Sequence, residues 1–556
     1  MMMTQKKIVV ALILLFFGES MLVADNQKGI DFYRGNMLET AKIYFNEQLP
    51  NLSGRDLAEA YYFLGNICFD QQKQNLAVDY YNKSVEADPE YPFGYVGQGA
   101  MALYNKNLKE ADDLFSKASK MDKKNSDIRV DAALAYAKNK LYEKTEDEIN
   151  KARKINKNNP RIYVAEGDIL LMQDPAKAGT AAAKYDNAIY FDSNCKEAYI
   201  KGSRVYRTIN IDVALEKTTT VLSLDSNYIP AYLELGETYY VNGLYTKSAE
   251  AYKRYMEAPG VPEEYQDKYA SALFVAKDFQ GVLNQAKQTL AKNPNNIHMN
   301  RLKMFTEYEL KDYTAALASA KAFFNTAKAK DIAWQDYRYY AMILKENKQP
   351  EAAIEALNSA VKTVTDQPEL YKELASAYAD KEDYKNAIPN YQRYFETSKE
   401  YSLSDILSYG QAHYYFSRNL PETAQYDAER KANIEKADSL FSEITIKAPQ
   451  LFQGYWWKAR VQAALDPDSK LGLAKPLYEK TLEAMNASGN SPKGIQVEIF
   501  NYLAFYYYVR YEEAYSKKNT SEANLNKNLS IENWEKVLEL QPENASAADA
   551  LRILKK

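Results

Sequence analysis

The sequence predicts an all-α solenoid of about fourteen helix–turn–helix units that ends in a capping helix. Three regularities predict it: a small residue recurs in steps of 34, a second small residue follows each about twelve positions later, and an aromatic residue often stands four positions further on. Glycine and proline, at 20 and 18 of 556 residues, are too few for an array of strands and turns. With 46% hydrophobic and 26% charged residues, the chain can bury a core and is not a disordered one.

The first 24 residues read as a secretory signal peptide. Lys6 and Lys7 precede an uncharged apolar run of ten residues, and Ala24 offers a small residue for cleavage before Asp25. A spanning helix needs about 20 apolar residues, so this run is too short. We expect the protein to be exported to the periplasm, and a peripheral position at the outer membrane is one location open to it there. An uncleaved inner-membrane anchor that presents the solenoid to an assembly complex is the alternative.

The first small residue of each unit keeps a period of 34 over most of the chain. The series runs Gly65, Gly99, Ala133 and Gly167, then Gly202, Gly236, Ala270 and Met304, then Ala341, Ala375 and Gly410, before the spacing loosens to Ala459 and Ala504. A fixed period of this length is the signature of a stack of identical supersecondary units.

The second small residue is alanine in ten of the fourteen units. These are Ala41, Ala77, Ala111, Ala181, Ala214, Ala316, Ala353, Ala387, Ala437 and Ala474. The aromatic residue after it is Phe45, Tyr81, Phe115, Tyr185, Tyr252, Tyr391, Phe441, Tyr478 or Trp534. Small residues on both helices of a pair let the helices approach closely, and we expect the aromatic ring to fill the space between that pair and the next.

This pattern resembles the tetratricopeptide repeat, a helix–turn–helix of 34 residues. The best single copy is Tyr232-Leu-Glu-Leu-Gly-Glu-Thr-Tyr239 with Ser248 and Tyr252. The resemblance covers about 29–544 in roughly fourteen units. It implies a right-handed superhelix in which the first helix of each pair, helix A, lines a concave binding surface.

We expect an N-terminal solenoid over 25–330, a C-terminal solenoid over 331–544 and a capping helix over 545–556. The C-terminal solenoid carries insertions at 418–435 and 515–529, which should form loops or lengthened helices. Cys68 and Cys195 fall in units several layers apart, so we expect two separate thiols, one on a buried helix and one in a turn.

The sequence offers no catalytic residues, no cofactor-binding motif and no metal ligands. Nucleotide-binding, metalloprotease and serine-hydrolase motifs are missing, and the two histidines, His298 and His413, lie in different repeats. No stretch free of repeats is long enough for a fused catalytic domain. The formal net charge of −4 argues against a nucleic-acid partner. We therefore expect a non-enzymatic protein without cofactors.

Aromatic residues beside the small positions of the A helices are the candidate partner-binding residues. They are Tyr62, Phe63, Phe69, Tyr104, Tyr199, Tyr206, Tyr240, Tyr339, Trp456, Trp457, Tyr502, Phe505 and Tyr508. Tyrosine and tryptophan are enriched at interface hot spots, although packing between repeats is an alternative role for each of them. We expect at least one ring of the adjacent Trp456–Trp457 pair to be exposed, because neighbours on a helix point in different directions.

The peptide-tail clamp of chaperone-binding members of this family is not supported. Asn66 matches one of its positions, but Tyr62 and Gly97 depart from it, and Asp127 and Asp131 stand where it needs basic residues. We expect a scaffold that binds hydrophobic or aromatic-rich segments of other proteins, as part of an envelope assembly or secretion complex. A carbohydrate- or polymer-handling subunit, in which Tyr and Trp stack on sugar rings, is the alternative.

Overall fold

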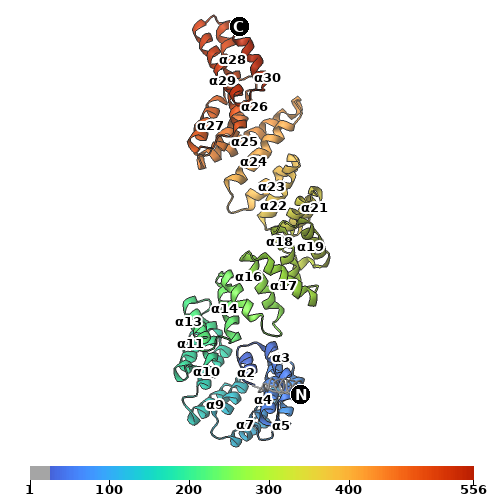
Figure 1. Ribbon diagram of the computed structural model, residues 1–556, viewed down its shortest axis with the longest axis vertical. Helices are drawn as coiled ribbons and strands as arrows, with labels where there is room; N and C mark the ends of the chain where they lie inside the picture. The colour runs from blue at the N-terminus through green and yellow to red at the C-terminus, as the bar shows by residue number, and fades with distance from the viewer. Residues whose placement is uncertain (1–25) are drawn as a thin grey trace, which may run out of the picture. The chain divides into compact units, whose positions relative to one another are not determined.

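A computed structural model describes residues 26–556, which form 29 α-helices, four short 3-10 helices and no strand (Figure 1). The helices divide into two compact units, Met1–Leu310 and Lys311–Lys556, the first described from Asn26 onward. The all-α fold expected from the sequence is confirmed. The signal peptide predicted over 1–24 lies outside the described residues. None of the described helices is long and apolar enough to cross a membrane.

Unit 1 consists of consecutive helix pairs. Its helices are α2 (Asn26–Arg34), α3 (Leu38–Gln48), η1 (Leu49–Asn51), α4 (Gly54–Asp70), α5 (Gln74–Ala87), α6 (Pro92–Tyr104), α7 (Leu108–Met121), α8 (Ser126–Lys138), α9 (Tyr142–Ile155), α10 (Pro160–Gln173), η2 (Pro175–Lys177), α11 (Ala178–Phe191), α12 (Lys196–Tyr206), α13 (Ile211–Leu224), α14 (Ile229–Val241), α15 (Tyr245–Tyr255), α16 (Glu263–Val275), α17 (Phe279–Lys292) and α18 (Ile297–Glu309). Even-numbered helices are the A helices of the pairs.

Unit 2 continues the same alternation. Its helices are α19 (Tyr313–Thr326), η3 (Ala329–Asp331), α20 (Trp334–Glu346), α21 (Pro350–Thr363), α22 (Pro368–Asp380), α23 (Tyr384–Thr397), α24 (Leu403–Asn419), η4 (Ala424–Tyr426), α25 (Asp427–Lys447), α26 (Phe452–Leu465), α27 (Lys475–Ser488), α28 (Lys493–Ser516), α29 (Thr520–Leu540) and α30 (Ala545–Leu554). Helices α2 to α17 make eight pairs in unit 1, helices α20 to α29 make five pairs in unit 2, and α30 follows as the capping helix.

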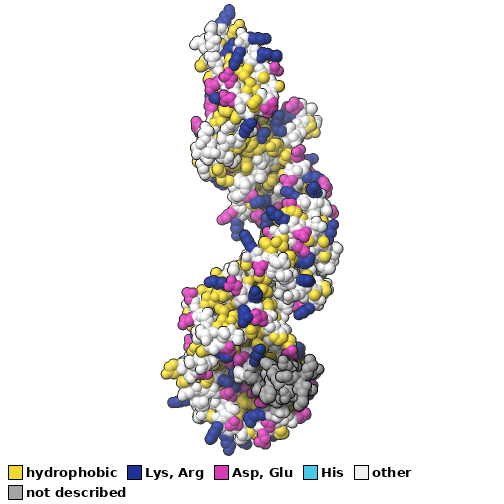
Figure 2. All heavy atoms as spheres, in the orientation of Figure 1, with side chains coloured by type: hydrophobic (Ala, Val, Ile, Leu, Met, Phe, Trp, Pro, Cys, Tyr) yellow, Lys and Arg dark blue, Asp and Glu magenta, His cyan; other side chains and the backbone are white. Residues whose placement is uncertain are grey.

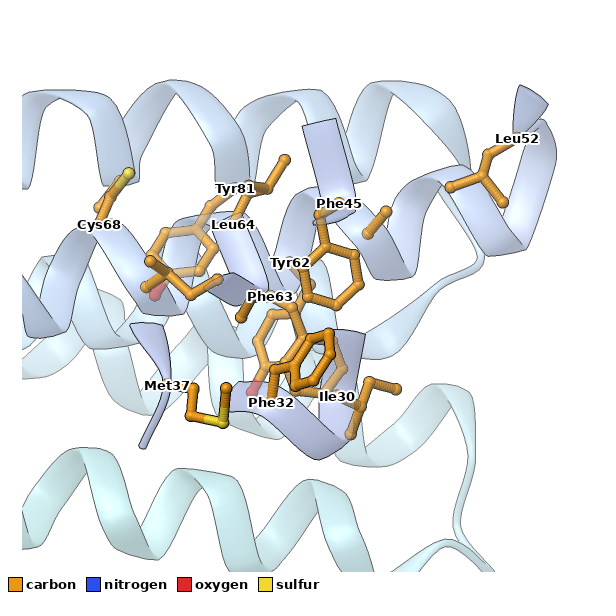
Figure 3. Close-up of a cluster of buried hydrophobic side chains, with 14 of the residues drawn as sticks. Ile30, Phe32, Met37, Phe45, Leu52, Tyr62, Phe63, Leu64, Cys68 and Tyr81 are labelled. Atoms are coloured by element: carbon orange, nitrogen blue, oxygen red, sulfur yellow. The ribbon is translucent and has the colours of Figure 1, made fainter. Parts of the chain in front are cut away.

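The repeated small and aromatic residues pack together as the spacing indicates. A Cβ added to Gly65 would lie 2.4 Å from the ring of Tyr81, and one added to Gly99 would lie 2.5 Å from the ring of Phe115. Both rings are buried, and Tyr81 belongs to the hydrophobic cluster drawn in Figure 3. The glycine of helix A thus leaves the space that the aromatic residue of helix B fills.

A residue in the left-handed conformation ends many of the A helices. Ten of the turns between described helices contain a non-glycine residue in this conformation, and in six of them it is a lysine, as at Lys106 with φ 61°. The Lys106 amide donates to Leu103 O (2.9 Å) and the Asn107 amide donates to Ala102 O (2.8 Å), which satisfies carbonyls at the helix end. Lysine therefore takes the left-handed position that glycine usually occupies in such a turn.

The two predicted insertions are mostly helix. The segment 418–435 contains the end of α24, a short linker with η4 and the start of the 21-residue α25. The segment 515–529 joins the 24-residue α28 to the 21-residue α29 through a tight turn. The two units divide between α18 and α19, twenty residues before the boundary expected at 330. A solenoid has a continuous core, so no break in composition marks such a division.

Candidate binding groove of unit 1

The A helices of unit 1 surround a cavity of about 410 Å³. Most of its lining comes from α2, α4, α6, α8, α10 and α12, the first helices of six consecutive pairs. This is the surface on which the sequence places partner binding. One side of the cavity is aromatic and the other is charged.

Three of the candidate residues, Tyr62, Phe63 and Phe69, line the aromatic side on α4. Tyr62 and Phe63 are largely buried, and Phe63 stacks on Phe45 with 5.8 Å between ring centroids. Figure 3 shows these rings beside Phe32 and Tyr81. Phe69 is half-buried, and the Lys138 ammonium lies 5.3 Å from its ring centroid. Phe69 therefore offers the most accessible ring of the three.

An ion-paired arginine links the aromatic side to the charged side. Arg161 Nη2 donates to Asp131 Oδ1 (2.6 Å), and Arg161 Nη1 lies 3.0 Å from Asp127 Oδ2. The Tyr62 hydroxyl donates to the other oxygen of Asp131 at 2.8 Å. Burial alone lowers the pKa of Arg161, but Asp131 and Asp127 outweigh it and hold that pKa well above its ordinary value.

A second buried cation lies on α12. Lys201 Nζ is 2.5 Å from Asp168 Oδ2 and 3.1 Å from Glu197 Oε1. Burial alone lowers the pKa of Lys201, but Asp168 and Glu197 raise it above its ordinary value. Burial alone raises the pKa of Glu197, but Lys201 and Arg34 hold it below its ordinary value. Lys201 and Glu197 therefore both stay charged near neutral pH.

The paired charges decide what the cavity can accept. Each buried cation already has carboxylate partners, so an anionic ligand would have to compete with them. The carboxylates are spread over several helices, and no group of three metal-ligating side chains occurs among residues 26–556. The arrangement can hold a segment by aromatic contact and by hydrogen bonds to polar groups. Lys and Arg side chains are interspersed with Asp and Glu over the face seen in Figure 2.

The other candidates of unit 1 lie outside the lining of this cavity. Tyr104 is 48% exposed and contacts Phe69 edge to face at 6.2 Å. Tyr199 borders a different hollow between α11, α12 and α13, together with Tyr190. Tyr206 lies near Lys217 of α13, and Tyr240 packs against Tyr245 and Tyr252. Tyr199 and Tyr206 therefore face helices B, because the two sides of an A helix contact different neighbours.

The tryptophan pair of unit 2 separates into two roles. Trp457 is only 4% exposed and lies against Phe441, with 5.5 Å between centroids, and Tyr414. Trp456 is half-buried and its Nε1 donates to Glu498 Oε1 at 3.1 Å. The guanidinium of Arg460 stacks on both indoles. Placing Trp457 in a partner groove was wrong, because its ring fills the space between consecutive pairs.

The remaining candidates of unit 2 differ in exposure. Tyr339 is half-buried on α20. Tyr502 is half-buried against Tyr478, with 4.9 Å between ring centroids. Phe505, on the same helix α28, is 41% exposed, and Tyr508 further along packs on Tyr511. Phe505 is therefore the most exposed of these four candidates.

Sequence reasoning placed Asp127 and Asp131 at groove positions but did not name the other charged residues of the unit 1 cavity, such as Asp168 and Lys201, as candidates. Asp131, Asp168 and Lys201 lie within two positions of the small residues Ala133, Gly167 and Gly202. Such positions face the groove whether they carry aromatic or charged side chains. Charged residues this close to the small residues of successive A helices were the signal that could have found them.

Comparisons with known proteins agree with this architecture. The tetratricopeptide repeat family matches residues 58–91, which are parts of α4 and α5 with the following turn. No curated protein matches the chain.

Several solved structures are similar to this chain. One is the C-terminal part of a tetratricopeptide-repeat-containing protein from Cytophaga hutchinsonii, 27% identical over 51% of this chain and 99% of that chain, with a TM-score of 0.41. Yeast Tom70 is 14% identical over 73% of this chain and 98% of its own, with a TM-score of 0.31. PilF of Pseudomonas aeruginosa is 17% identical over 38% of this chain and 96% of its own, with a TM-score of 0.31.

The family match and the 34-residue period of the helix pairs indicate the same repeat. Residues 58–91 hold one repeat, with Gly65 and Ala77 at its small positions and Tyr81 at its aromatic position. Pairs with the same packing precede and follow it along the described chain. Residues 58–91 are therefore a tetratricopeptide repeat, within a stack of helix pairs that share its packing.

Proposed function

We propose that this protein is a non-enzymatic scaffold that binds a segment of another protein in the groove of unit 1. The observation that carries the proposal is the cavity formed by six consecutive A helices, with aromatic rings on one side and internally paired charges on the other. A segment with aromatic and uncharged polar side chains fits both sides. An acidic tail does not, since it would meet Asp131, Asp168 and Glu197.

The first test compares two aromatic truncations in the mature protein. Phe69→Ala removes a half-buried ring from the cavity, and Tyr190→Ala removes a ring that is 82% exposed on α11, outside the cavity. Partners are captured from envelope extract, identified, purified and titrated against both variants. Losing a hot-spot aromatic costs about 2 kcal/mol, which is about thirtyfold in affinity. We expect that loss for Phe69→Ala alone, and equal affinities would contradict the proposal.

We further propose that the protein acts in the periplasm, within an envelope assembly or secretion complex. The support is the signal-like pattern of residues 1–24 and the apolar run that is too short to span a membrane. Fractionation with mass spectrometry of the N-terminus tests it. We expect a mature chain that begins near Asp25 and is released by osmotic shock. An intact Met1 in the membrane fraction would overturn the periplasmic proposal.

One observation favours handling of carbohydrate as a second candidate function. Tyr508, Tyr511 and Tyr515 follow one another along α28, with ring centroids 6.3 and 5.9 Å apart. These rings lie beyond the residues of α28 that pack in the hydrophobic core. A glycan-binding screen tests this surface, and Tyr511→Ala with Tyr515→Ala should abolish any glycan binding while capture through unit 1 persists. A screen without a hit would leave the scaffold as the single proposal.

A further inference from the structure

The first helix pair of unit 1 contacts two other parts of the unit. It stacks on α4, the next helix along the chain, and α2 also contacts α14. Figure 1 shows α2 and α14 close together. In a linear repeat array each unit contacts only its neighbours. Here the chain of helix pairs returns on itself.

The seam between α2–α3 and α14–α16 is closely packed. A Cβ added to Gly35 would lie 2.5 Å from Pro230 Cβ, and one added to Gly260 would lie 2.3 Å from Ile43 Cδ1. A single hydrophobic cluster joins residues of α2 and α3 to Leu233 of α14 and to two tyrosines of α15. The contact is therefore continuous with the core of unit 1.

Two ion pairs border this seam on the side of α12. Arg34 Nε lies 3.6 Å from Glu197 Oε2, and Lys196 Nζ lies 3.6 Å from Asp31 Oδ2. Both distances are longer than a charge-assisted hydrogen bond, and the cations keep about a quarter of their surface exposed, 28% and 27%. The two pairs therefore connect α2 to α12.

The helix pair α2–α3, called the hairpin below, also forms part of the cavity wall. Tyr33, Arg34, Asn36 and Leu38 all line the cavity. With the hairpin docked, the cavity volume of about 410 Å³ is at the low end of the range for small-ligand pockets, about 300–1,000 Å³. A short peptide segment fits such a volume and a folded partner does not.

We propose that the α2–α3 hairpin is a gate: docked on α14–α16 it closes the groove of unit 1, and released it opens the groove to a longer segment. The hairpin is the first helix pair of the described residues, and the two ion pairs at its seam are long and partly exposed, so they do not hold it firmly. The inference rests on the proposed function only for the occupant of the groove.

Amide hydrogen exchange on the full mature chain tests the gate without any partner. Gly35→Trp places a ring where even a Cβ meets Pro230, and Asp31→Lys is a milder variant that sets a like charge beside Lys196. Gly179→Trp is the control, since no atom lies within 4 Å of a Cβ there. We expect about tenfold faster exchange in both α2–α3 and α14 for the two seam variants. Faster exchange confined to α2–α3, or in neither segment, would overturn the gate.

A disulfide lock tests whether the gate controls entry. In a background without Cys68 and Cys195, Gly35→Cys and Pro230→Cys place two thiols at the seam. The two Cβ atoms lie about 1 Å closer than a disulfide requires, and the turn at Gly35 can move to increase that distance. The probe is the partner protein titrated against Phe69→Ala. We expect at least about tenfold weaker binding in the oxidised form and recovery on reduction. Equal binding in both forms contradicts gating even where the Phe69 result supports the groove.

Discussion

The contact between Gly236 and Tyr252 gives a quantitative test of how the repeats pack. A Cβ at Gly236 would lie 2.6 Å from Tyr252 Cδ1 and 2.7 Å from Cε1, which is about 1 Å inside ordinary contact. Tyr252 cannot move easily, because it is fully buried and its hydroxyl donates to Glu237 Oε1 at 2.5 Å. Gly236→Ala should therefore strain the ring, although alanine is the better helix former.

The magnitude follows from two opposing effects. Overpacking costs about 1–3 kcal/mol, and replacing glycine by alanine inside a helix returns about 0.5–1 kcal/mol. We expect a net loss of about 1 kcal/mol for Gly236→Ala and of about 3 kcal/mol for Gly236→Leu. Gly202 is the equivalent residue one repeat earlier, and its nearest neighbour is the flexible Lys217 chain at 3.1 Å. Gly202→Ala should be neutral or stabilising by up to about 1 kcal/mol.

Urea denaturation followed by circular dichroism measures both variants, with hydrogen exchange to locate the loss. Because repeat stability is a sum of nearest-neighbour terms, exchange should rise around α14 and α15 and stay unchanged in unit 2. If Gly236→Ala is as stable as the native chain, or if Gly202→Ala loses as much, the aromatic-on-glycine packing does not hold the pair together.

Three further predictions concern stability. Trp457→Ala should cost about 3–5 kcal/mol and Trp456→Ala clearly less, since only the first empties a buried site; equal losses in urea denaturation would contradict this. Because the pKa of Glu197 is lowered in the folded protein, its carboxylate contributes stability above its ordinary pKa of 4.5, and this stability is lost as the pH falls through the folded pKa. Glu197→Gln should therefore weaken the fall of the melting temperature at acid pH. An unchanged fall would refute the pairing. Lys106→Gly should stabilise by up to about 1 kcal/mol, because glycine adopts the φ of 61° without strain, and calorimetry showing a loss would count against the turn geometry.

The fold could be predicted because the same spacing of small and aromatic residues recurs in many units. Gly65 with Tyr81, Gly99 with Phe115 and Gly236 with Tyr252 each obey the same spacing, so errors in one unit do not spoil the assignment. The free cysteines also lie as expected, with Cys68 buried on α4 and Cys195 in the turn before α12.

The site was less predictable, because a period says which helix faces the groove but not which way each side chain turns. Phe63 lines the cavity as expected, whereas Trp457, which also lies two residues before the small residue of its helix, is core. The charged wall depends on pairs between repeats, such as Arg161 with Asp131, which are far apart in a single repeat's pattern. The return of α2 onto α14 depends on the summed curvature of several pairs, and no local motif records it.

Site-specific photo-crosslinking tests the central claim most directly. Benzoylphenylalanine replaces Phe69 inside the cavity, or Tyr190 on the outside of the same unit, and cells that express either protein are irradiated. Adducts are identified by mass spectrometry of the crosslinked peptide. The account predicts that position 69 captures one short segment of a partner protein reproducibly and that position 190 does not. Adducts at position 190 with none at position 69 would contradict binding in the groove of unit 1.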